Sequence, residues 1–188
     1  YQVGLKANEF QFSGYILVHK LLLLFSAGTN LDVLLSEIPK FLGFCQNTHN
    51  QWAIDAILSA QLPILNLCGQ TQGKFDFHNG ETWEVEYLEN CQHNRSFSAL
   101  GLYFIHKLQV LYLYEKYTAA LQSSQAVEPF LEALLSTFAI AEHQFFTALT
   151  LTALYPTATL QQRKQYWQQI ETIQAQLQVW EQNCPENF

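Results

Sequence analysis

The sequence predicts an all-α protein in which antiparallel helix pairs stack side by side as an α-solenoid. Apolar residues recur at helical spacings of three and four along nearly the whole chain, and strand-like alternation is missing. Short breaks rich in Gly, Pro or Asn separate these stretches, and short connections make consecutive helices antiparallel neighbours. The resulting pairs recur about every 40 residues, which is the period of helix-pair solenoids.

The first half of the chain holds four of about eight predicted helices. Gly28 can adopt the left-handed conformation that ends the first helix, and Asn30 and Asn50 can cap the second and third. Pro39 and Pro63 lie inside predicted helices and should kink or split them. The four ranges are 9–27, 31–46, 51–69 and 81–90. The stripe expected on one side of the first helix consists of Phe12, Tyr15, Ile16, His19, Leu22 and Leu23.

The second half holds the other four predicted helices, and Thr159 should cap the last of them. We expect Trp167 to be a core residue of that helix and Trp180 to be partly exposed. The four ranges are 96–114, 117–134, 137–154 and 160–182. The face that the last helix should bury consists of Trp167, Ile170, Ile173, Leu177 and Trp180. Its expected contacts on the preceding helix are Phe145, Leu149 and Thr152. The helices should pair in chain order, the first with the second and so on.

The composition excludes several classes of protein. The chain has 9 basic and 16 acidic residues, a net charge of −7, whereas nucleic-acid binders need clustered Lys and Arg. The longest apolar run, 15–25, is shorter than the roughly 20 residues of a membrane span. Four cysteines without a CxxC spacing indicate reduced thiols, so we expect a cytoplasmic protein that contacts neither nucleic acid nor membrane. Neither end resembles a natural terminus, which predicts that residues 1–188 are one helical-repeat domain cut from a longer protein.

Motifs for nucleotide chemistry are weak. Gly69 and Gly73-Lys74 resemble part of a phosphate-binding loop, but Phe75 replaces the Ser or Thr that should follow the lysine. No nucleophile elbow of the G-x-S-x-G kind occurs. The adjacent pair Glu142-His143 points in two directions on a helix, so it does not make a catalytic dyad by itself. We therefore expect no enzymatic activity and no cofactor in this segment.

Candidate metal ligands are equally sparse. Cys45 and His49 are four residues apart, Cys91 and His93 are two apart, and the four could hold zinc only if their segments met. A di-iron bundle would need Glu-x-x-His motifs, which the sequence lacks. Helix-end residues are the better interpretation of all four, so the sequence predicts no metal.

Histidines and aromatic residues within apolar stripes are expected in the core. His19, His106 and His143 should be hydrogen-bonded core histidines. The high aromatic content should mainly fill the interfaces between helix pairs. A partner-binding alternative stays open for Tyr103, His106 and Tyr114, which would lie on a concave solenoid surface that receives a peptide.

The tetratricopeptide pattern fits this chain loosely. With Ala120 at the small position of the second helix, Phe104 takes the Trp position and Tyr117 lies just inside the turn. Lys107 and Ser124 then stand where Leu and Phe are expected. A tetratricopeptide-like stack is therefore predicted rather than a strict one.

Several segments resemble the helical-repeat region of very large bacterial signalling proteins that are common in cyanobacteria. Those proteins join a serine/threonine kinase, an AAA-type ATPase module, this helical region, a GAF domain and often a sensor histidine kinase. The resemblance spans most of the chain and weakens over about 31–95. The segments are YQVGLKA (1–7), FSGY (12–15), LGLYFIHKL (100–108), LYEKYTAAL (113–121), EHQFFTALTLTALYP (142–156) and WEQNCPENF (180–188).

The resemblance implies a non-catalytic regulatory and protein-interaction scaffold in a multidomain signalling kinase. Its partners would be neighbouring domains of the parent chain or a protein or peptide. The kinase and ATPase residues of that family lie outside these positions, so none is carried over. The alternative is a helical sensor domain that buries an apolar small molecule between helices. The sequence does not indicate an oligomeric state.

Overall fold

The computed structural model describes residues 9–78 and 84–185, and every regular element in these residues is helical. This result confirms the predicted all-α class. The α-helices are α2 (Phe10–Ser26), α3 (Leu31–Asn47), α4 (Gln51–Leu67), α5 (Glu84–His93), α6 (Phe97–Leu113), α7 (Tyr117–Ala126), α8 (Ala139–Leu154) and α9 (Leu160–Asn183). Two 3-10 helices join them, η1 (Glu128–Leu134) and η2 (Tyr155–Thr157).

The predicted helix boundaries hold where a side chain or a glycine satisfies the helix end. Asn30 accepts hydrogen bonds from the backbone N–H groups at positions 32 and 33, and Asn50 accepts one from position 53. Thr159 forms a capping box with Gln162. Gly28 has a φ of 73°, the left-handed conformation expected after the first helix.

The prolines affect the helix boundaries in two ways. Pro39 and Pro63 lie inside α3 and α4, and both helices continue through them, so neither proline splits its helix. Pro129, by contrast, ends a predicted helix. The range 117–134 divides into α7 and η1, because a proline is favoured in the first turn of a new helix and disfavoured inside an old one.

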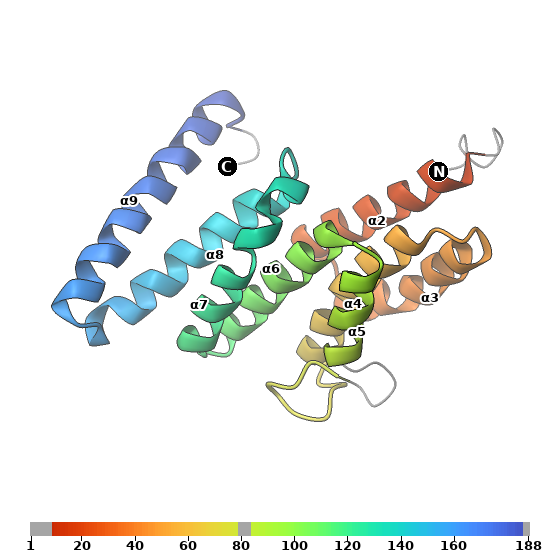
Figure 1. Ribbon diagram of the computed structural model, residues 1–188, viewed down its shortest axis with the longest axis horizontal. Coiled ribbons are helices and arrows are strands. Elements are labelled where there is room, and N and C mark those ends of the chain that lie inside the picture. The colour runs from red at the N-terminus through yellow and green to blue at the C-terminus, as the bar shows by residue number, and fades with distance from the viewer. Residues whose placement is uncertain (1–8, 79–83, 186–188) are drawn as a thin grey trace.

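The helices pack in order along the chain, from α2 and α3 at one end to α9 at the other (Figure 1). Helix α4 packs against α2, α3 and α6, and α6 packs against α7, η1 and α8. The predicted pairing of 51–69 with 81–90 is not found, since α4 packs mainly on α6, and α5 also packs on α6. Residues 81–83 of that second range lie outside the described residues. Helix α6 is therefore the centre of the core, with Leu100, Tyr103 and Leu108 fully buried.

Helix α2 buries the opposite side from the one expected. Phe12, Ile16 and Leu23 of the predicted stripe are 62%, 43% and 58% exposed, and His19 is exposed as well. The buried side instead consists of Ser13, Gly14, Leu17, Val18, Leu21 and Phe25. Small residues at 13 and 14 let α2 approach α4 closely, which the apolar periodicity alone does not reveal.

Gly14 and Gly43 provide a matched test of this close approach. A Cβ at Gly14 would clash with the side-chain amide of Asn50, which donates to the Gln11 carbonyl and caps α4. A Cβ at Gly43, inside α3, would meet nothing within 4 Å. We expect Gly14→Ala to lower the free energy of unfolding by about 1–3 kcal/mol. Gly43→Ala should raise it by about 0.5–1 kcal/mol through helix propensity, and urea denaturation measures both.

Helix α9 packs on α8, as predicted, and most of the expected face of α9 is at least half-buried: Ile173 is buried, and Ile170 and Leu177 are half-buried. Trp167 is 55% exposed and contacts the Tyr155 ring at its edge, with 6.5 Å between the ring centroids, so its assignment to the core is wrong. Trp180 is half-buried, as expected. On α8, Phe145 and Thr152 are exposed, and the buried residue of α9 is Ile173.

Truncation of Ile173 and of Trp167 should therefore have unequal effects on stability. Ile173→Ala removes a buried side chain and should cost about 2 kcal/mol of unfolding free energy. Trp167→Ala removes a side chain that is mostly in water and should cost less than about 1 kcal/mol. A larger loss at Trp167, measured by thermal or urea unfolding, would contradict this packing.

Candidate functional site

A cavity of about 530 Å³ lies between α2, α6 and the start of α8, and we call it the central cavity. Helix α4 and η1 also contribute to its wall. Most of its lining is apolar, as in small-molecule sites of similar size. The apolar side chains include Val18, Leu22, Leu23, Leu102, Leu134 and Phe138.

His106 from α6 is the most buried polar side chain that lines the central cavity. Its Nδ1 lies 3.2 Å from the Ser59 carbonyl oxygen of α4. Because a carbonyl only accepts hydrogen bonds, the ring proton belongs on Nδ1, and Nε2 keeps a lone pair that no described residue engages. Burial lowers the pKa of His106 to about 4, so the imidazole is neutral at neutral pH.

Glu142 and Ser26 join α8 to the end of α2 at the same cavity. The Ser26 hydroxyl donates to Glu142 Oε1 at 2.6 Å. Burial raises the pKa of Glu142, and the hydrogen bond from Ser26 opposes this shift. His19 also lines the cavity but is exposed, so its assignment as a core histidine is wrong. The Ser26–Glu142 pair was missed, because no short motif links residues so far apart in sequence.

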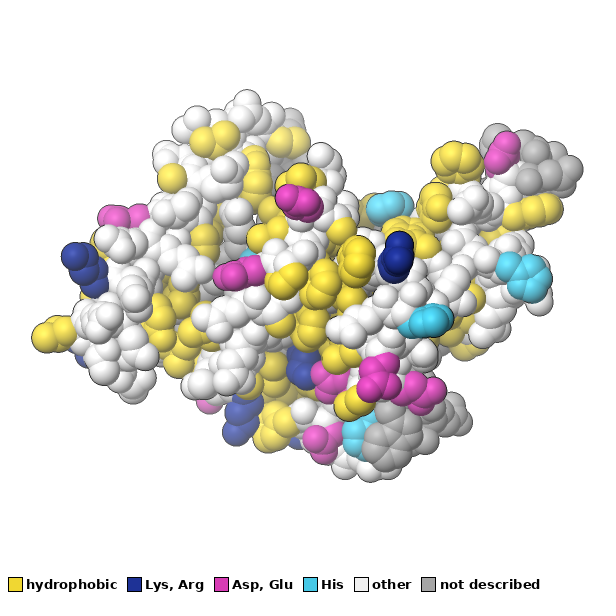
Figure 2. All heavy atoms as spheres, viewed as in Figure 1, with side chains coloured by type: hydrophobic (Ala, Val, Ile, Leu, Met, Phe, Trp, Pro, Cys, Tyr) yellow, Lys and Arg dark blue, Asp and Glu magenta, His cyan; other side chains and the backbone are white. Residues whose placement is uncertain are grey.

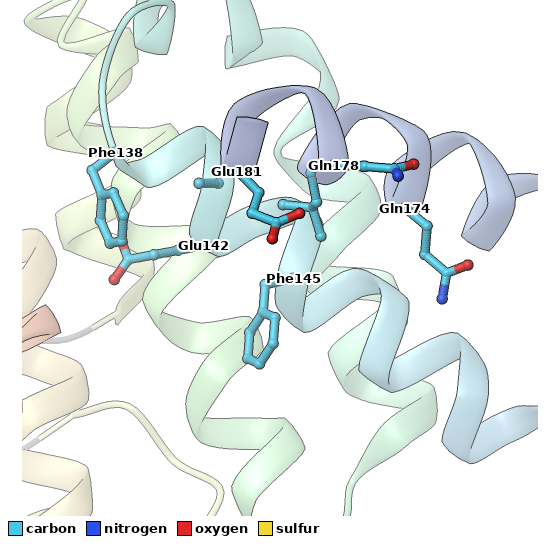
Figure 3. Close-up of a pocket in the computed structure, with 8 residues that line it drawn as sticks. Phe138, Glu142, Phe145, Gln174, Gln178 and Glu181 are labelled. Atoms are coloured by element: carbon cyan, nitrogen blue, oxygen red, sulfur yellow. The ribbon is translucent and has the colours of Figure 1, made fainter. Parts of the chain in front are cut away.

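A second groove, of about 510 Å³, runs between α8 and α9 and is named here the α8–α9 groove. It shares Phe138 and Glu142 with the central cavity. Figure 3 shows these two side chains at one end, Phe145 on the α8 side, and the polar side chains of α9 along the opposite wall. Those α9 residues are Gln174, Gln178 and Glu181. The two hollows therefore meet at Glu142.

The three candidate partner-binding residues do not form a shared surface. Tyr103 is fully buried. Burial is the main reason that the pKa of its hydroxyl lies far above the usual range, and the nearby Glu84 carboxylate raises this pKa further. Its hydroxyl makes no well-aligned hydrogen bond. His106 is buried at the central cavity. Tyr114 is half-buried and donates to the Asn66 carbonyl at 3.3 Å. The concave peptide-binding surface hypothesised for them needs correction, because two of its three residues are core residues.

The remaining chemical candidates are dispersed. Cys45 and Cys91 are buried free thiols, and burial raises the pKa of Cys91 to about 12. Within 9–78 and 84–185, no three His, Cys, Asp or Glu side chains group closely enough to hold a metal ion. Glu142 and His143 diverge, because His143 Nε2 lies 3.1 Å from Ser124 on α7 and Glu142 reaches Ser26 on α2.

The chain matches no protein family, and no curated protein or solved structure is significantly similar to it. Among the described helices, none combines the length and the apolar content needed to cross a bilayer.

Proposed function

We propose that the chain is a non-catalytic, tetratricopeptide-like helical-repeat domain that acts as a regulatory scaffold in a multidomain signalling kinase of the cytoplasm. The packing of each helix on helices one or two positions away in the chain supports this proposal, because stacked repeats are held together by contacts between neighbouring repeats. The scaffold would bind neighbouring domains of its parent protein, or another protein or peptide.

The exposed apolar side of α2 carries this proposal. Phe12, Ile16 and Leu23 lie on one side of the helix. Their side chains are 62%, 43% and 58% exposed to solvent, respectively. Figure 2 shows further hydrophobic side chains gathered across the middle of the visible face. Contiguous exposed apolar side chains mark protein-contact surfaces in otherwise polar exteriors. A docked domain would cover these side chains of α2.

The test is a calorimetric titration of the chain with the purified kinase, ATPase and GAF domains of its parent protein. We expect one of them to bind, and Phe12→Asp with Ile16→Asp should weaken that binding by about tenfold or more. Val33→Asp is the matched control, because Val33 is equally exposed but lies on α3. Binding that survives the α2 substitutions, or no binding to any of the domains, would contradict the scaffold function.

A second function, a helical sensor of an apolar small molecule, is favoured by the central cavity. Its volume of about 530 Å³ and its apolar lining are typical of ligand sites. The sensor function predicts saturable, one-to-one binding of a neutral apolar fluorophore such as N-phenyl-1-naphthylamine. A fluorescence titration measures this binding, and a strictly linear, non-saturating response would exclude the function.

A further inference from the structure

We propose that the central cavity binds a neutral, mostly apolar alcohol whose hydroxyl donates a hydrogen bond to His106 Nε2. This inference rests on the sensor function and adds to it the chemical class of the ligand and the residue that selects it.

The polar groups around the cavity fall into two kinds. Most are already paired with the protein: Trp52 Nε1 donates to Ser98 Oγ at 2.8 Å, and the Ser26 hydroxyl donates to Glu142 at 2.6 Å. His106 is buried and only its Nδ1 is engaged, whereas His19 and Ser136, whose side chains also make no hydrogen bond to a described residue, are exposed. The cavity lining therefore includes an acceptor, on a buried residue, to which no described residue donates.

A buried acceptor without a donor selects for a ligand that supplies one. A molecule with a hydroxyl group satisfies the Nε2 lone pair when it enters the cavity. A molecule of the same shape without the hydroxyl displaces water from Nε2 but donates no hydrogen bond to replace the one that is lost. Discrimination between the two should therefore originate at His106 rather than in the apolar wall.

The charges near the cavity exclude an acidic ligand. No Lys or Arg is among the residues that line it, whereas the Glu142 carboxyl group is. A carboxylate or phosphate would enter without a counter-charge and would lie near an acidic side chain. A protonated amine would carry its charge into a mostly apolar cavity, where the loss of hydration disfavours it. A neutral alcohol fits both the acceptor and the apolar lining.

The experiment uses the whole chain with N-phenyl-1-naphthylamine as a fluorescent reporter and three competitors of equal chain length. These are 1-decanol, decyl methyl ether and decanoate. We expect the alcohol to displace the reporter at about tenfold lower concentration than the ether, which is the selectivity that one buried hydrogen bond supplies. Decanoate should compete more weakly than the alcohol.

Two variants locate this selectivity. His106→Phe keeps the edge-on ring contact with Phe25 but removes the acceptor, so the alcohol and the ether should compete equally while the reporter still binds. His143→Phe is the matched control: His143 is also hydrogen-bonded to a backbone carbonyl, that of Ser124, but it lines a different groove. This control should keep the tenfold preference. Competition constants are corrected for the affinity of each variant for the reporter.

Wild-type protein gives an independent readout if His106→Phe does not fold. The ¹⁵N resonance of His106 Nε2 should shift on addition of 1-decanol and stay in place on addition of the ether. Equal competition by alcohol and ether in the wild type, or an unmoved Nε2 resonance, overturns the inference but leaves the sensor function standing. Failure of the reporter to bind at all removes the sensor function itself.

Discussion

Asp55→Ala should lower the free energy of unfolding by about 3 kcal/mol, one of the two largest effects that we expect in this protein. Asp55 is only 2% exposed, and its carboxylate links α4 to the junction between α5 and α6. It accepts hydrogen bonds from Ser96 Oγ at 2.5 Å, Gln51 Nε2 at 2.8 Å and Asn94 Nδ2 at 3.1 Å. Removing the carboxylate breaks all three bonds and leaves the buried Ser96 hydroxyl without its acceptor.

Asp32→Ala is the matched control for this substitution. Asp32 is exposed in the first turn of α3, where a carboxylate gains only the modest favourable interaction with the helix N-terminus. Its loss should cost less than about 1 kcal/mol. Urea denaturation of both variants with a common slope measures the difference, and similar losses at the two positions would contradict the role assigned to Asp55.

Acidification should cost up to about 3 kcal/mol through His106 alone, between pH 6.5 and about 4. Burial lowers the pKa of His106 to about 4 in the folded protein, whereas the unfolded chain has the ordinary value of 6.5. Above pH 6.5 neither state is protonated, and the stability is complete. As the pH falls through this window, only the unfolded state binds the proton, so unfolding becomes easier.

The variant His106→Gln isolates this contribution, because glutamine retains an amide donor for the Ser59 carbonyl but does not titrate. Burial also lowers the pKa of His143 and raises that of Glu142, so these groups act in opposite directions on the total pH profile. The difference between the wild-type and variant profiles removes both. Urea unfolding at steps from pH 7.5 to 4.5 should give diverging curves, and parallel curves would refute the assignment.

Helix positions were predictable because their signals are local. Asn30, Asn50 and Thr159 cap helices whose ends the sequence marks, and each cap involves residues at most three positions away. Pro129 is also a local signal, because a proline in the first turn of a helix predicts the boundary between α7 and η1. The prolines at 39 and 63 show the limit of such signals, because α3 and α4 continue through them.

Which side chains are buried, and which residues form the candidate site, was less predictable, because both depend on contacts between residues that are distant in the sequence. Helix α2 is apolar nearly all round, so its periodicity does not choose a side, and the small pair Ser13-Gly14 decides it by admitting α4. Trp167 follows helical spacing yet is 55% exposed, because spacing along one helix does not show which of its positions the neighbouring helix covers. His106 was recognised as a buried histidine, but its unpaired nitrogen follows only from the position of Ser59.

The hydrogen bond between Ser26 and Glu142 joins residues 116 positions apart, in a structure whose packing runs mostly between neighbours in the chain. Bringing the two ends of so long a segment together has an entropic cost, which is offset only once the intervening helices have packed on one another. We therefore expect the bond to form late, on the native side of the folding transition state, and to contribute to the barrier against unfolding rather than to the rate of folding. The part of the central cavity that Ser26 and Glu142 line should then be completed late during folding and should open early during unfolding.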